Sequence, residues 1–315
     1  RRLIAEWDTN ARFDVSVCDF LSASLNFPAQ PRTPTVLFQH NVESLLWQRQ
    51  AATERHPVKR LVYELEAAKM ARYERATVAR FDHVLAVSDA DKAAMADMTT
   101  PDRISVIPTG VDTKTFRPVG HSHSPNPIVL FLGSMDWEAN IDGVQYFVNE
   151  IWPAIHAAVP AARFHVVGRN PAGAITRLAS DNVEIVGTVP SVVEYLHRAP
   201  AMVVPLRIGG GTRLKIYEAM GAARAVVSTT IGAEGLDVTS GRDIVLADSP
   251  GEFGAAVVRV LRDASYRRRL EDEALATASR YDWSAIAEQF ERVLVSVVER
   301  TPVNERQSAL TRAVA

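Results

Sequence analysis

Residues 201–220 read AMVVPLRIGGGTRLKIYEAM and contain the pattern that indicates the fold. An apolar run typical of a buried strand ends, Gly209, Gly210 and Gly211 follow, and a helix is predicted after Thr212, which can cap it. Glycines let backbone N–H groups approach an oxyanion closely, and a helix N-terminus adds the positive end of its dipole. The pattern favours an anion-binding loop; the alternative is a glycine-rich turn with surface charges.

The predicted helix carries charges that suit a nucleotide ligand. Lys215 and Glu218 are three residues apart and share a helical face, whereas Arg213 and Lys215 do not. A cation facing phosphates and a carboxylate facing a hydroxylated ring would fit a nucleoside diphosphate. The glycines match neither the dinucleotide fingerprint nor a P-loop, so a nicotinamide enzyme is disfavoured.

Short apolar runs alternate with longer amphipathic ones, which predicts βα units around parallel sheets. The later strands are expected at residues 128–132, 163–167, 183–186, 201–204, 225–228 and 243–246. The earlier strands are expected at residues 13–20, 35–38, 83–87 and 104–107. The fold class is therefore α/β, with a complete Rossmann-like, doubly wound second domain and a smaller or incomplete first one. Loops at the carboxyl ends of the later strands should line one crevice.

The domain boundaries follow from a polar segment rich in turn-forming residues. We expect a first domain at 1–118, a linker at 119–127, a second domain at 128–283, a closing helix at 284–300 and a tail at 301–315. The chain starts with Arg1 rather than methionine, so we expect the native N-terminus to be missing.

Composition excludes several classes of function. The chain of 315 residues has a net charge of −2 and a pI of about 6.5, which disfavours nucleic acid as a partner. Its single cysteine, Cys18, excludes a disulfide framework and favours a reducing, cytoplasmic compartment. His121 and His123 lie in the linker without a neighbouring carboxylate, so no metal site is predicted.

A long helix is predicted from Pro57 to Arg80, before the third strand of the first domain. Its basic side chains are Lys59, Arg60, Lys69, Arg72, Arg75 and Arg80. We interpret them as a solvated face; the alternative is contact with anionic lipid or a phosphorylated acceptor.

Four segments match, in order, segments of a known family. They are QHNVE at 39–43, VSDAD at 87–91, VIPTGVD at 106–112 with FRP at 116–118, and EAM at 218–220 leading to VV at 226–227. In these segments the chain resembles the retaining glycosyltransferases of family 4, over residues 13–300. The resemblance implies a GT-B fold of two facing Rossmann-like domains. It also implies metal-independent transfer, without a cofactor, from a nucleoside-diphosphate sugar to a glycan or lipid-linked acceptor, with membrane contact as an option.

The same resemblance assigns residues of the donor site. Glu218 falls on the family's ribose-binding glutamate, and Lys215 falls on a cation that meets the donor diphosphate. Gly133 falls in the loop beneath the diphosphate, and the backbone near Thr188 and Val189 falls where the family holds the base.

Two further expectations rest on the resemblance. His40 falls where a histidine touches the donor sugar across the cleft, although a packed or strand-capping histidine is the alternative. The closing helix at 284–300, which carries an apolar stripe, is expected to cross back onto the first domain.

The chain departs from the family pattern at two places. The first of the family's two glutamates is replaced by Gly210, so its hydroxyl contact must be supplied elsewhere or lost. The usual basic pair after the first strand of the second domain is replaced by Asp136, Trp137 and Asn140, so Arg213 and Lys215 are expected to make the phosphate contacts instead. A non-catalytic sugar-nucleotide-binding module and a GT-B sugar-nucleotide epimerase remain the alternatives.

Overall fold

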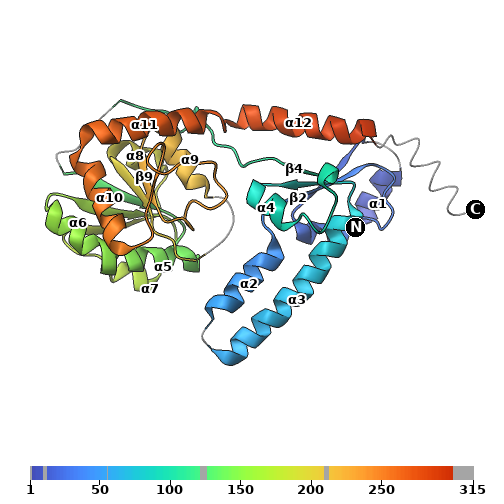
Figure 1. The fold of residues 1–315 in the computed structure, drawn as a ribbon, viewed down its shortest axis with the longest axis horizontal. Coiled ribbons are helices and arrows are strands. Elements are labelled where there is room, and N and C mark those ends of the chain that lie inside the picture. The colour runs from blue at the N-terminus through green and yellow to red at the C-terminus, as the bar shows by residue number, and fades with distance from the viewer. Residues whose placement is uncertain (1, 10–12, 55, 121–125, 209–212, 301–315) are drawn as a thin grey trace, which may run out of the picture. The chain divides into compact units, whose positions relative to one another are not determined.

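The computed structural model describes residues 2–9, 13–54, 56–120, 126–208 and 213–300, and Figure 1 shows its elements. The chain divides into two compact units, the first made of Arg1–Pro108 with Ile286–Ala315 and the second of Thr109–Ala285. Each unit contains a parallel sheet and its own apolar core. The predicted α/β class with two Rossmann-like units is confirmed.

The first unit is built on a parallel sheet with the strand order β1-β2-β3-β4. Its strands are β1 (Ser16–Asp19), β2 (Thr35–Gln39), β3 (His83–Ala86) and β4 (Ile104–Val106). Every residue of β3 is buried, as expected of a central parallel strand that is covered on both faces.

The first unit also contains helices before and between these strands. They are α1 (Arg2–Thr9), η1 (Leu21–Asn26), α2 (Glu43–Thr53), α3 (Pro57–Arg80), α4 (Asp89–Ala94) and η2 (Pro101–Arg103). The bounds of α3 are those predicted from the sequence. At α4 the Ser88 hydroxyl accepts the Asp91 backbone N–H at 3.1 Å and so caps the N-terminus of the helix.

The second unit has a parallel sheet with the strand order β10-β9-β8-β5-β6-β7. The strands are β5 (Ile128–Leu132), β6 (Arg163–Val167), β7 (Val183–Gly187), β8 (Ala201–Val204), β9 (Ala225–Ser228) and β10 (Val245–Leu246). In chain order this is the doubly wound arrangement, whose direction reverses between β5 and β8. All residues of β5 and β8 are buried, in keeping with their central position.

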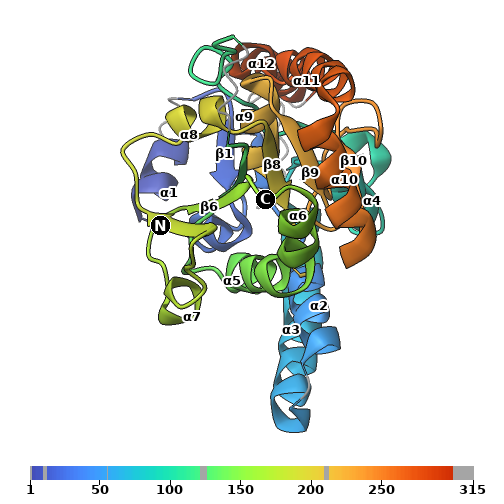
Figure 2. The ribbon, with the colours of Figure 1, turned by 90° about the vertical axis from the view of Figure 1, so that its left-hand side faces the viewer.

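Helices cover both faces of this sheet (Figure 2). They are α5 (Glu138–Tyr146), the π-helical η3 (Phe147–Ile151), α6 (Trp152–Ala158), α7 (Gly173–Thr176), α8 (Val193–Arg198), α9 (Leu214–Gly221), α10 (Pro250–Arg262) and α11 (Ala264–Ser279). α10 packs beside α6, and α11 packs beside α9 on the opposite face.

Three local features differ from the sequence-based expectation. The strand expected at 13–20 is shortened to Ser16–Asp19 because Phe20 has a φ of 66°, which ends the extended conformation. Arg213 occupies the N-cap position of α9, so the helix begins one residue later than expected, and Thr212, which we expect as the cap, lies outside the described residues. Residues 109–118 pack with the second unit, whereas we assigned them to the first.

The reason for this assignment of 109–118 is backbone pairing. The Val111 N–H donates to the Tyr281 carbonyl at 2.8 Å, and the Trp283 N–H donates to the Val111 carbonyl at 3.1 Å. These bonds join the segment to the end of the second unit, while His121 and His123 of the expected linker lie outside the described residues.

The closing helix α12 (Trp283–Arg300) belongs to the first unit from Ile286 onward. The ring of Phe290 stacks 5.9 Å from the ring of Phe38 on β2, and the Gln289 amide donates to the Val106 carbonyl of β4 at 3.1 Å. The apolar stripe of α12 thus has its partner surface on the sheet of the first unit.

Candidate functional site

The strand order of the second unit places the candidate site at the carboxyl ends of β5 and β8. In doubly wound sheets, ligands bind outside the carboxyl ends of the strands where the order reverses. The loop after β5 begins at Gly133, and the segment after β8 leads into α9. Gly209, Gly210, Gly211 and Thr212, which we predicted to form the anion-binding loop, lie outside the described residues.

Lys215, in the first turn of α9, connects these two segments. Its ammonium Nζ donates to the Leu132 carbonyl at 2.6 Å and to Asn140 Oδ1 at 3.1 Å. The same Nζ lies 4.6 Å from the centroid of the Phe131 ring. The amine of Lys215, which is positively charged when protonated, is therefore held at the end of β5, where the strand order reverses.

Burial changes the acid–base behaviour of this helix. Burial and the nearby charge of Arg213 lower the pKa of Lys215 to about 7, while Glu218 acts in the opposite direction. Burial raises the pKa of Glu218, and Lys215 opposes that rise. Within the described part of α9, Lys215 forms no ion pair with Glu218, because its ammonium bonds to Leu132 and Asn140 instead. The structure therefore does not contain a simple ion pair between these two residues on the surface of the helix.

The loop after β5 is packed so closely that it requires glycine. A Cβ atom on Gly133 would lie 2.8 Å from Asn140 Nδ2, and one on Gly168 would lie 1.7 Å from the Gly133 carbonyl oxygen. The Gly133 N–H donates to the Val167 carbonyl at 3.0 Å. The ends of β5 and β6 are thus joined by backbone contacts.

Asn140 lies in the candidate site, and the sequence did not indicate the contacts that it makes there. Its side chain is buried; Nδ2 donates to the Ser134 carbonyl at 2.8 Å, while Oδ1 accepts from Lys215. We had interpreted it as part of the replacement for a basic pair. In the structure it holds both the loop and the lysine, and only its place at the start of α5 could have drawn attention to it.

Arg213 lies beside Lys215 and is held by an aromatic ring. Its side chain is buried, and its guanidinium carbon lies 4.7 Å from the centroid of the Trp137 ring. Trp137 is 40% exposed. The structure therefore brings two cations together at the carboxyl edge of the sheet, although the two residues do not share a helical face.

Thr188 and Val189 follow β7 on the same edge of the sheet. The Gly168 N–H donates to the Gly187 carbonyl at 2.9 Å, which ties the end of β7 to the loop after β6. Thr188 is exposed, and Val189 packs against the core. Residues predicted to hold a base thus share one edge of the sheet with the two cations.

His40 belongs to the first unit, at the end of β2. Its Nε2 lies 2.6 Å from Asp19 Oδ1, and its ring stacks on Phe20 and Phe38 with centroid distances of 4.2 and 4.5 Å. The structure therefore gives His40 a packed environment within its own unit. Its contact with the donor sugar stays a prediction.

Glu74 is a second residue that the sequence did not single out. Its fully buried carboxylate accepts the Glu43 N–H at 2.8 Å and the Ser44 N–H at 3.2 Å. It thereby caps the N-terminus of α2 and fixes the turn that follows His40. A glutamate inside a charged helix carries no signal that distinguishes it from solvated neighbours.

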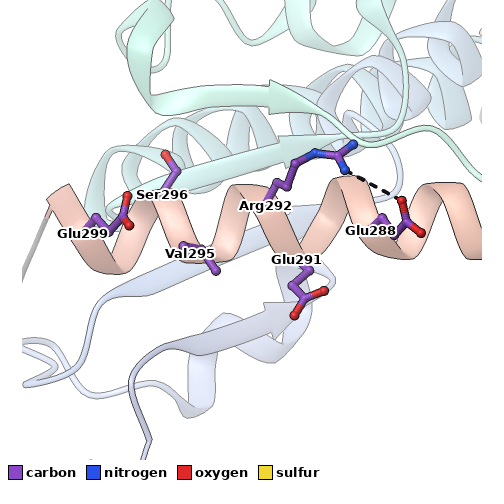
Figure 3. Close-up of a pocket in the computed structure, with 6 residues that line it drawn as sticks. All are labelled: Glu288, Glu291, Arg292, Val295, Ser296 and Glu299. Carbon is purple, nitrogen blue, oxygen red and sulfur yellow. Dashed lines mark ion pairs between the residues drawn. The ribbon is translucent and has the colours of Figure 1, made fainter.

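A hollow of about 320 Å³ lies along α12 in the first unit (Figure 3). Its lining residues are Glu288, Glu291, Arg292, Val295, Ser296 and Glu299. Arg292, the one cation of this lining, lies 3.9 Å from the Glu288 carboxylate. Three carboxylates would repel a diphosphate, so this hollow is not the donor site.

The described residues contain neither a membrane-spanning helix nor a cluster of metal-ligating side chains. None of the helices that the structure describes is both long and apolar enough to cross a bilayer. No group of three or more His, Cys, Asp or Glu side chains in those residues is arranged to hold a metal ion.

Comparisons with known proteins agree with this architecture. A family model described as glycosyltransferase family 4 matches residues 1–115, and one described as glycosyl transferases group 1 matches residues 126–263. With the two Rossmann-like units, these matches identify the chain as a glycosyltransferase, an enzyme of the GT-B architecture.

Curated relatives are distant. The phosphatidyl-myo-inositol mannosyltransferase of Mycolicibacterium smegmatis is 27% identical over 225 residues, which cover 68% of this chain and 57% of the relative. The D-inositol 3-phosphate glycosyltransferase of Frankia alni is 27% identical over 256 residues, covering 73% of this chain and 60% of the relative. The chain thus spans less than two thirds of the length of these two relatives.

Solved structures share the fold. Sucrose-phosphate synthase from Thermosynechococcus elongatus superimposes with a TM-score of 0.72 at 19% identity, covering 94% of this chain and 77% of that one. HepE of Anabaena, solved in complex with UDP, gives a TM-score of 0.69 at 19% identity, with coverage of 94% and 82%. At this identity the likeness concerns the fold alone.

Proposed function

We propose that the chain transfers a glycosyl group from a nucleoside-diphosphate sugar to a glycan or lipid-linked acceptor, with retention of the anomeric configuration. The observation that carries the proposal is the ammonium of Lys215, held at the end of β5 by Leu132 and Asn140. A cation fixed where the strand order reverses is suited to a phosphate-bearing ligand.

The proposed chemistry depends on stabilising the leaving diphosphate. As the glycosidic bond breaks, the sugar acquires oxocarbenium character and negative charge develops on the departing phosphate. Lys215 and Arg213 would balance that charge, and the backbone at Gly133 would lie beneath the diphosphate. Because Lys215 has a pKa near 7, an anionic ligand would favour its protonated form.

Other residues of the site would orient the donor. Glu218 would accept hydrogen bonds from the ribose hydroxyls, and the backbone of Thr188 and Val189 would contact the base. His40 would contact the donor sugar. The nucleotide requires no separate cofactor in this scheme, and the solved neighbour that binds UDP supports a nucleotide of this kind as the ligand.

The acceptor class rests on the relatives. Both curated relatives named above act, by their names, on inositol-containing acceptors, and one of those acceptors is a lipid. Retention of the anomeric configuration is proposed from the resemblance of the sequence to the retaining glycosyltransferases of family 4. The family matches favour a transferase over a non-catalytic binding module or an epimerase.

The donor site is tested by calorimetric titration with UDP, GDP and ADP. A phosphate-bound cation contributes roughly 1.5–3 kcal/mol, so Lys215→Ala should weaken nucleotide binding about tenfold or more. Glu218→Gln keeps the shape of the side chain and should weaken nucleotide binding more than binding of inorganic diphosphate.

Matched controls lie in the same unit. Lys114→Ala and Glu273→Gln change exposed residues, one before β5 and one in the middle of α11, and should bind nucleotide as the parent does. If the Lys215 and Glu218 variants also bind every nucleotide like the parent, the donor site is elsewhere. Turnover with a donor that binds, followed by NMR of the product anomer, tests transfer and retention.

A further inference from the structure

The helical hairpin formed by α2 and α3 has a face that the first unit does not use. In Figures 1 and 2 the two helices lie side by side and extend away from the sheet of their own unit. They are held together by their inner faces: the rings of Trp47 and Tyr63 lie 6.0 Å apart, and Ala67 is buried. The opposite face of α3 is therefore turned to solvent.

That outer face is apolar along the first half of α3. Val58, Leu61, Val62 and Leu65 are 63%, 56%, 49% and 54% exposed. Their spacing of three, four and seven residues places them side by side on one face of the helix. A group of large exposed apolar side chains in this arrangement is typical of an interaction surface.

Basic residues lie further along the same face of α3. Lys69 and Arg72 follow Leu65 by four and seven residues, so they extend the line of the apolar side chains toward the end of the helix. Across α3 there are six basic and three acidic residues, in a chain whose net charge is −2. One of the three acidic residues, Glu74, is buried.

The remaining acidic residues do not cancel this charge pattern. Glu64 pairs with Arg60 at 2.9 Å, and Glu66 pairs with Lys69 at 2.7 Å, in both cases between exposed side chains. Exposed pairs of this kind contribute little and exchange readily for other anions. The outer face therefore combines an apolar stripe with a net excess of cations.

We propose that this face of α3 docks on a bilayer surface that carries anionic headgroups. The apolar side chains would enter the boundary between headgroups and acyl chains, while the lysines and arginines would reach lipid phosphates. A second copy of the chain is a poorer occupant, because two identical faces would bring their excess positive charges together. We had interpreted this basic helix as solvated; the exposed apolar stripe is what distinguishes a docking face from a solvated one.

The inference goes beyond glycosyl transfer and uses no property of the donor site. It would bring the first unit to the surface where a lipid-linked acceptor resides. The evidence for membrane docking lies on α3 alone. The docking proposal can therefore be wrong while the proposed donor site is right, and the donor site can be wrong while the docking proposal is right.

The test is co-sedimentation of the whole chain with vesicles of phosphatidylcholine, with and without phosphatidylglycerol. We expect binding to the vesicles with phosphatidylglycerol, weakened by added salt. L61S with L65S should lower the partition coefficient by at least about tenfold, because apolar insertion is lost. K69Q with R72Q should lower it about fivefold for each charge, and only on the anionic vesicles.

The matched control removes one exposed apolar side chain and one exposed basic side chain from another helix of the same unit. V295S with R292Q changes side chains of α12 that are 50% and 69% exposed, and it should sediment like the parent. Nucleotide titration and thermal melting of each variant show that it is folded.

Several results would overturn the proposal. They are a parent chain that stays in the supernatant, a parent that binds neutral and anionic vesicles equally, and α3 variants that sediment like the parent. A fourth such result would come from light scattering. If the parent chain is a dimer and L61S with L65S converts it to a monomer, this face of α3 is an interface between two copies of the chain.

Discussion

Helices α9 and α3 both carry lysine and arginine, yet the two helices use them in opposite ways. On α9, Lys215 donates to a strand carbonyl and to a buried amide, and its pKa falls to about 7. On α3, Lys69 is 70% exposed and its partner is a glutamate of the same helix. The difference shows that charge alone does not make a lysine part of a site. The fixed partners that surround the side chain do.

The largest expected effect that would sharpen this comparison is the pH dependence of nucleotide affinity. The pKa of Lys215 is about 7 in the free protein, and a bound anion raises it. Affinity should therefore be full at low pH and fall as the pH rises through 7, by roughly tenfold between about pH 6 and about pH 8.

The matched variant is Lys215→Arg, whose guanidinium stays charged throughout this range. Titration of the nucleotide's own phosphates is common to both proteins, so the difference between their calorimetric profiles isolates the lysine. Identical profiles for parent and variant would show that the protonation of Lys215 does not govern binding.

A smaller effect is expected at Asn140, which positions Lys215 without a charge of its own. Asn140→Ala removes the acceptor at 3.1 Å from Lys215 Nζ and the donor at 2.8 Å from the Ser134 carbonyl. Nucleotide affinity should fall about threefold to tenfold, and the free energy of unfolding by about 1–2 kcal/mol.

Calorimetry and urea denaturation measure the two quantities. Asn126→Ala, a substitution in the same unit before β5, serves as the control. A variant of Asn140 that loses stability but keeps its full nucleotide affinity would limit the residue to a structural role.

The smallest effect is expected on α3. Lys69→Ala removes an exposed pair with Glu66 at 2.7 Å, and should change the free energy of unfolding by less than about 0.5 kcal/mol. Nucleotide affinity should stay within about twofold of the parent. A loss as large as that of Lys215→Ala would remove the distinction between the two helices.

Much of the fold was predictable because it depends on local pattern. The alternation of apolar strands and amphipathic helices predicted the two parallel sheets, and α3 begins and ends at the predicted residues. At the site, the helical spacing of Lys215 and Glu218 indicated a shared face. The family resemblance placed Gly133, Thr188 and Val189 in the donor site; in the structure they share one edge of the second sheet with these residues.

The sequence by itself determined which residues form strands and helices, since periodicity and glycine placement act over a few residues. Only the tertiary structure decided that Asn140 meets Lys215, 75 residues further along the chain, and that Glu74 is buried beneath α2. It also decided which face of α3 is exposed, because apolar residues occur on both faces of that helix. Burial and partners depend on what packs from distant segments, and local pattern does not contain that information.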